Sequence, residues 1–229
     1  MNKKYDELIK YVKQTEALSH ASGLIAWDQE TMMPKGSVLQ RADCLASLES
    51  EIHKRKSNKI ISDLLGEVNT TNLNQEQNSN IYHIERSFLR ASKIPNDLAT
   101  EIAKICSLSQ MSWVEANKTK NTNDFLGYFR EVINLKRQEA QIISKSNNVY
   151  DALIDDFEPG MTSNKLDIIF KNLRPNLINL RQKIKEKKYQ INEIDFIFDK
   201  NIQLEISNNL AKLFGYNFNI GRIDISQHP

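Results

Sequence analysis

The sequence has 229 residues, of which 40% are hydrophobic and 26% charged, and its 31 basic and 29 acidic side chains leave a net charge of +2. This balance is typical of a folded protein and excludes an intrinsically disordered chain. The charge excess is too small to indicate a nucleic-acid partner. No stretch reaches the ~20 apolar residues of a membrane span. The N-terminus is charged where a signal peptide is apolar, so we expect a cytoplasmic protein without a membrane partner.

The opening segment predicts a long amphipathic helix. Apolar side chains three and four residues apart, beginning at Tyr5 and continuing through Ile25, follow the period of an α-helix. Pro34 restricts the residue before it, so the helix should stop near residues 31–36. Ser37 is then expected to cap a second helix, with Gln40 completing a capping box.

The same periodicity continues along most of the chain. It predicts helices over about residues 37–56, 60–68, 74–89, 95–113, 125–143, 166–184 and 200–214. Asn74 and Gln77 form a second capping signature, and Gly215 suits a left-handed helix terminator. Pro175 lies inside the helix over 166–184 and predicts a kink there. The basic run 183–188 is interpreted as a solvated helix end.

Two segments depart from the helical pattern. Residues 147–160 are acidic and irregular, and we interpret them as a loop between helices. Residues 218–225 alternate with period two, which predicts a β-strand. The predicted fold is therefore all-α, an elongated multi-helix assembly with one short β-strand near the C-terminus. No linker divides the chain, so residues 1–229 are expected to form a single helical region.

The sequence motifs of several common enzyme classes are missing from the chain. It contains no HExxH zinc helix, no G-x-S-x-G elbow, no phosphate-binding glycine loop and no dinucleotide fingerprint. The pairs Glu16–His20 and Glu49–His53 lie at helical spacing, but such pairs are usually surface contacts. Cys44 and Cys106 are interpreted as reduced core cysteines. We therefore predict no metal-binding and no catalytic residue in this chain.

Three segments together resemble the thermostable carboxypeptidase (carboxypeptidase Taq) family of zinc metallocarboxypeptidases. The segment 24–34 resembles the end of that family's first long helix, and 150–162 resembles its acidic break before another long helix. The segment 221–229 is similar to the strand that leads into the family's His-Pro-Phe motif, of which only His and Pro are present here. The matching residues are Trp27, Asp28, Glu30, Pro34, Asp155, Asp156, Glu158, Pro159, Gly160, Gly221, Arg222, Asp224, His228 and Pro229.

The resemblance implies an elongated helical fold with a deep groove, and commonly a homodimer. In the complete family, a zinc-bound water attacks the last peptide bond of a peptide, so the members are hydrolases that act as proteases. The zinc helix and the groups that hold the substrate carboxylate follow the segment matched here. The resemblance therefore implies that this chain is the substrate-enclosing front part, and it places His228 and Pro229 near the substrate groove.

Individual motif residues also have structural interpretations. Trp27 is expected to be a core anchor whose indole N–H is hydrogen-bonded. Asp28 and Glu30 are expected to cap or brace the turn at Pro34. Asp155, Asp156 and Glu158 either face the groove or form an acidic loop, and the loop is the favoured interpretation.

Two functional hypotheses follow. The favoured one is a truncated or split metallocarboxypeptidase, inactive alone, whose zinc-carrying half is supplied by a second polypeptide. The alternative is a non-enzymatic helical module for dimerisation or protein binding. The predicted strand at 218–225 should distinguish them, because a module adapted to stand alone would not keep an unpaired edge.

Overall fold

A computed structural model describes residues 2–145, 148–187 and 199–226 of the chain. The described residues are mainly α-helical and contain no β-strand, which confirms the all-α prediction. The helices are α1 (Lys3–Thr31), α2 (Val38–Lys56), α3 (Lys59–Glu67), α4 (Gln75–Ala91), α5 (Asn96–Thr119), α6 (Asn123–Ile143), α7 (Val149–Phe157), α8 (Ser163–Glu186) and α9 (Lys200–Leu213), with short 3₁₀ turns at Lys35–Ser37 and Thr70–Asn72. None of these helices is long and apolar enough to cross a membrane.

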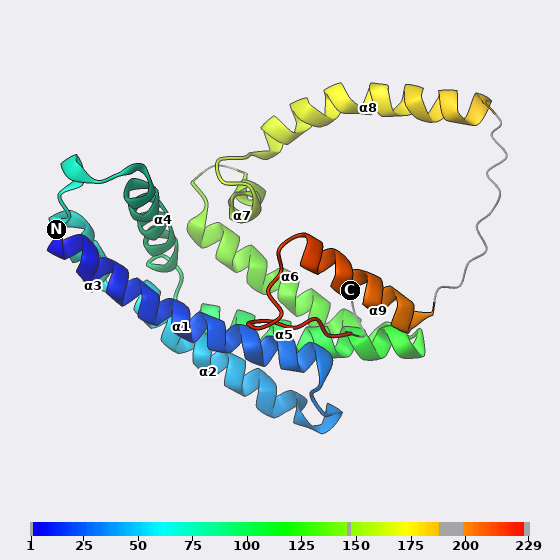
Figure 1. Cartoon of the computed structure of the whole chain (residues 1–229), viewed down its shortest axis with the longest axis horizontal. Helices are drawn as coiled ribbons and strands as arrows, with labels where there is room; N and C mark the ends of the chain where they lie inside the picture. The colour runs from blue at the N-terminus through cyan, green and yellow to red at the C-terminus, as the bar shows by residue number, and fades with distance from the viewer. Residues whose placement is uncertain (1, 146–147, 188–198, 227–229) are drawn as a thin grey trace. The chain divides into compact units, whose positions relative to one another are not determined.

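The described residues fall into two compact units, one ending at Gly160 and the other running from Met161 to Ser226. In the first unit, α1 lies along α2, α2 along α5, and α5 along α6 (Figure 1). The prediction of a single region over residues 1–229 stays a prediction.

Small side chains allow α2 to lie close to its neighbours. Ala42 is fully buried and Ala46 is 6% exposed on one face of α2. Residues four apart share a helix face, so these two alanines leave a shallow strip with little side-chain bulk. α2 and α5 consequently make the most extensive contact in the first unit.

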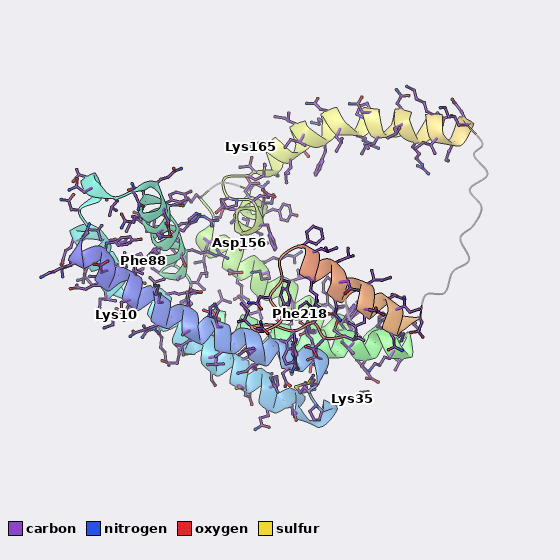
Figure 2. All side chains as sticks on the ribbon, in the orientation of Figure 1. Lys10, Lys35, Phe88, Asp156, Lys165 and Phe218 are labelled. Carbon is purple, nitrogen blue, oxygen red and sulfur yellow. The ribbon has the colours of Figure 1, made fainter. Side chains whose placement is uncertain are left out.

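An apolar cluster joins the start of α1 to α3 and α4. Tyr5 and Leu8 of α1 pack with Ile61 and Leu64 of α3, and Phe88 of α4, labelled in Figure 2, covers the cluster. Leu8 is fully buried. The reciprocal capping box of Asn74 and Gln77 fixes the start of α4, as the sequence predicted.

Four local predictions are wrong. Ser37 makes no side-chain cap, because the chain enters α2 through the 3₁₀ turn and already places Ser37 near helical geometry. Residues 149–157 form the helix α7, whereas a loop was predicted. Residues 218–226 form turns and extended backbone, because no strand of the described chain pairs with them. Cys44 and Cys106 are exposed, whereas core positions were predicted for both.

The second unit contains α8, α9 and the segment after α9. α8 continues through Pro175 and is curved rather than broken (Figure 1). Gly215 ends α9 with a φ of +87°, the left-handed conformation predicted for it. The part of the basic run that the structure describes, residues 183–187, ends α8 as expected.

Leu8→Ala should lower the free energy of unfolding by about 2–5 kcal/mol, because it leaves a cavity in the cluster that joins α1 to α3. Chemical denaturation of the 229-residue chain measures this change. Leu24→Ala is the matched control on the same helix, since Leu24 is 69% exposed, and it should change stability by less than about 0.5 kcal/mol. Equal losses in the two variants would contradict the assigned packing.

Candidate functional site

The motif over residues 24–34 forms the end of α1 and the turn into α2. Asp28 accepts a hydrogen bond from Arg41 of α2 at 2.5 Å, and its carbonyl oxygen accepts from the N–H groups of Met32 and Met33. Asp28 therefore braces the turn before Pro34, as predicted. Trp27 is only half-buried, so its predicted role as a core anchor is not seen.

Gln29 is the most buried polar residue of this motif, at 5% exposed. Its amide nitrogen donates to the Ser107 carbonyl oxygen at 3.2 Å and to Oε1 of Gln110 at 3.0 Å, and its Oε1 accepts from the Ser107 hydroxyl at 2.7 Å. Glu30 accepts from Gln110 at 2.7 Å, so it braces α5 and not the Pro34 turn. These bonds fix the end of α1 against α5.

A hollow of about 460 Å³ lies beside this junction, between the turn and α5. Met33, Leu39 and Met111 contribute apolar surface to it, and Lys35 lies at its border (labelled in Figure 2). Lys35 pairs with Glu115 at 2.7 Å. Two of the charged groups at the border thus contact one another, and Glu30 and Lys118 also line the hollow.

A second set of motif residues forms a charged cluster on α4, α6 and α7. Arg86 donates to the carbonyl oxygen of Asp155 at 2.6 Å and to its Oδ2 at 2.8 Å, and Arg90 donates to Asp156 at 2.7 Å. Arg90 also donates to the buried Glu139 at 2.9 Å, which accepts a further bond from Lys136. We refer to these residues as the charged cluster; they are Arg86, Arg90, Lys136, Glu139, Asp155 and Asp156.

The position of the two aspartates explains why arginines are needed. Asp155 and Asp156 lie in the last turn of α7, where the partial negative charge of the helix end opposes a carboxylate. The N–H of Gly160, at 2.7 Å, and the guanidinium of Arg86 lower the pKa of Asp155 below its usual range. Burial raises the pKa of Asp156 in spite of Arg90. The cluster contains three cationic and three acidic side chains, so it offers no excess charge to a substrate.

The remaining residues of the acidic motif lie at the end of α7. Glu158 is its C-cap residue and is exposed, as are Pro159 and Gly160. Gly160 has a φ of +80°, a conformation that glycine adopts without strain. Of the motif acids, the structure therefore brings together Asp155 and Asp156 but leaves Glu158 outside the cluster.

The third motif lies in the second unit, after α9. Arg222 donates through Nε to Asp224 at 2.8 Å, and the Tyr216 hydroxyl donates to the Arg222 carbonyl oxygen at 3.2 Å. A Cβ at Gly221 would lie 2.2 Å from the Tyr216 hydroxyl oxygen, so glycine is needed for this close approach. His228 and Pro229 lie outside the described residues.

The metal that the resemblance implies can be compared with the side chains present. A zinc site takes three or four nitrogen, sulfur or oxygen ligands from the protein. Within residues 2–145, 148–187 and 199–226, no group of three or more His, Cys, Asp or Glu side chains is placed to hold a metal ion. These residues do not fit a zinc centre, and no catalytic step can be assigned to them.

His53 is a buried core residue on α2. It is 6% exposed, and neither of its ring nitrogens has a hydrogen-bond partner among the described residues. Burial, and then the positive charge of Lys56, lower the pKa of His53 below its ordinary value of 6.5. Glu49, one turn earlier on α2, has a pKa that burial raises. His53 is therefore packed in the interior, whereas Glu49 is only half-buried.

The sequence reasoning missed Gln29, Arg86, Arg90 and Glu139. Arg86 and Arg90 lie four residues apart, which places both on one face of α4. That spacing indicates a paired basic site. The aspartate partners lie more than sixty residues away in the sequence, so periodicity alone does not identify them. No sequence signal identifies Gln29, because glutamine is common on exposed helix surfaces and its position alone does not indicate burial.

Comparison with known proteins identifies relatives along the whole chain. Residues 7–229 match the family described as carboxypeptidase Taq (M32) metallopeptidase. The chain is 29% identical over 240 residues to Thermostable carboxypeptidase 1 of Thermus thermophilus, and 26% identical over 227 residues to Carboxypeptidase 1 of Bacillus subtilis. These alignments cover 98% and 97% of this chain but 47% and 45% of the relatives. The chain thus spans about half the length of the curated relatives it matches.

Solved structures share the fold. The crystal structure of BsuCP matches with a TM-score of 0.91 at 26% identity, covering 99% of this chain and 46% of that one. Trypanosoma cruzi metallocarboxypeptidase 1 matches with a TM-score of 0.77 at 26% identity, covering 99% of this chain and 47% of that one. The predicted family resemblance is confirmed.

Arg90→Leu should lower the free energy of unfolding by about 1.5–3 kcal/mol, because it removes charged hydrogen bonds from the buried Glu139 and from Asp156. Arg137→Leu, at an exposed position of α6, is the matched control and should have little effect. Urea denaturation at neutral pH measures both. An Arg90→Leu chain as stable as the control would show that the cluster does not hold α4 to α6 and α7.

The buried His53 predicts a pH dependence of stability. Because the folded-state pKa lies below that of the unfolded chain, the unfolded chain binds more protons as the pH falls, and stability should decrease between about pH 7.5 and 5.5. His53→Leu should reduce this decrease, whereas His20→Leu, at an exposed position, should retain it. Glu49 acts in the opposite direction, since its raised pKa favours the folded state in acid. Identical pH dependence in both variants would contradict the burial of His53.

Proposed function

We propose, because this chain belongs to the carboxypeptidase Taq (M32) metallopeptidase family, that it forms the substrate-enclosing half of a metallocarboxypeptidase. In this proposal the enzyme removes residues from the C-terminus of peptides, and zinc is held by residues that these 229 do not include. The observation that carries the proposal is the match of 99% of this chain to 46% of BsuCP with a TM-score of 0.91.

Two features of the chain support a division of labour between halves. The sequence contains no HExxH motif, and its described residues contain no group of three or more metal-binding side chains. The motifs at 24–34 and 150–162 instead build structural contacts, through Asp28 and the charged cluster. We therefore expect this chain alone to be inactive.

The non-enzymatic alternative gains no support from the family match. A strand over residues 218–225 would distinguish the two hypotheses. No strand forms there, so this segment favours neither of them. A cytoplasmic location and a homodimer remain part of the proposal, as does a zinc-carrying partner half.

Zinc content and peptidase activity test the proposal together. The purified 229-residue chain, dialysed against zinc, should hold far less than one zinc per chain and should release no C-terminal amino acid from a peptide. Co-expression with the second half of Bacillus subtilis Carboxypeptidase 1, the part outside its match to this chain, should restore both. That half expressed alone is the control and should be inactive.

Two results would contradict the proposal. One tightly held zinc per chain in the 229-residue protein would mean that these residues contain a metal site. Zinc binding without release of the C-terminal amino acid, when both halves are present, would mean that the assembled fold has another function.

A further inference from the structure

The apolar stripe of α8 is the longest exposed apolar row in the second unit. Leu166 is half-buried, and the other stripe residues are 46–58% exposed. Their spacing of three and four residues places them on one face of the helix. A contiguous exposed apolar row of this kind marks an interaction surface. We refer to this row as the α8 stripe; it consists of Leu166, Phe170, Leu173, Leu177, Leu180 and Ile184.

The charges on α8 restrict what can cover the stripe. The helix has six basic side chains and two acidic ones, the acidic ones being Asp167 and Glu186. Two copies of this helix brought face to face would therefore repel each other. The complementary surface is an apolar strip bordered by carboxylates, because these would pair with the lysines and arginines along the stripe. The basic side chains are Lys165, Lys171, Arg174, Arg181, Lys183 and Lys185.

We propose that the α8 stripe is the docking surface for the half of the metallocarboxypeptidase fold that these 229 residues do not contain. The inference rests on the proposed function. BsuCP matches 99% of this chain, a share that includes α8, yet more than half of the BsuCP chain lies outside the match. In BsuCP, the helix that matches α8 therefore belongs to a chain in which more than half of the residues are additional to the part matched here.

Limited trypsin digestion tests this docking, because α8 carries its own cleavage sites. Trypsin cuts after Lys171 and Arg181, but the bond between Arg174 and Pro175 resists it. The full 229-residue chain is co-expressed with the tagged second half of Bacillus subtilis Carboxypeptidase 1, and the complex is purified on the tag. Cleavage at Lys171 and Arg181 should be at least about tenfold slower in the complex than in the chain alone.

Variants on the two faces of α8 separate docking from general stability. The double substitution Leu173→Asp and Leu177→Asp places charge in the centre of the α8 stripe and should abolish co-purification and protection. Asn179→Asp introduces the same charge on the opposite face and should leave both unchanged. An equal loss in the two variants would overturn the inference, since charge alone and not the stripe would then decide the outcome.

The remaining outcomes distinguish this inference from the proposed function. Restored peptidase activity with α8 cut at its original rate would overturn the inference and leave the function standing. Protection of α8 from trypsin without peptidase activity would support the inference and contradict the proposed function. Failure of the two halves to co-purify would contradict both the inference and the proposed function. Protection already present in the chain alone would mean that its own residues cover the stripe. Stronger protection by phosphatidylglycerol vesicles than by the second half would assign α8 to a membrane surface, and either result overturns the inference.

Discussion

An amphipathic helix is stable in water only when its apolar face is covered, and this constraint shapes the two units differently. In the first unit, Tyr5 and Leu8 of α1 are buried against α3, and the small side chains of Ala42 and Ala46 let α2 lie close to its neighbours. In the second unit, the apolar residues of α8 keep about half of their surface in water. The first unit therefore contains the core of the described chain, and the second unit exposes the apolar surface of α8.

Polar contacts then fix the positions of the helices along one another, which apolar packing alone does not determine. Gln29 reaches from the end of α1 to Ser107 and Gln110 of α5, and its two bonds to Ser107 lie in a buried position where losing them would be costly. The charged cluster does the same for α4, whose Arg86 and Arg90 offset the carboxylates at the unfavourable end of α7. The motifs at 24–34 and 150–162 thus serve to hold helices at set positions.

Local signals allowed most of the helical fold to be predicted from the sequence. The capping box of Asn74 and Gln77, the stop before Pro34 and the left-handed Gly215 all depend on neighbours within a few residues, and all three are present. α7 was missed although Asn148 caps it by accepting from the N–H of Tyr150 at 3.1 Å, because the acidic residues that follow favour a loop. Partners distant in sequence, such as Arg86 and Asp155, could not be found from periodicity. The predicted strand at 218–225 failed for a related reason, since a strand forms only when another segment pairs with it.

Residues up to Gly160 contain the buried core, whereas the apolar face of α8 is exposed. α5 and α8 offer a direct comparison, because each has 24 residues. Native-state hydrogen exchange of the 229-residue chain should show the amides of α5 exchanging only through global unfolding, and those of α8 at least about a hundredfold faster. Equal protection of the two helices would contradict the account, because α8 would then belong to the same folded core.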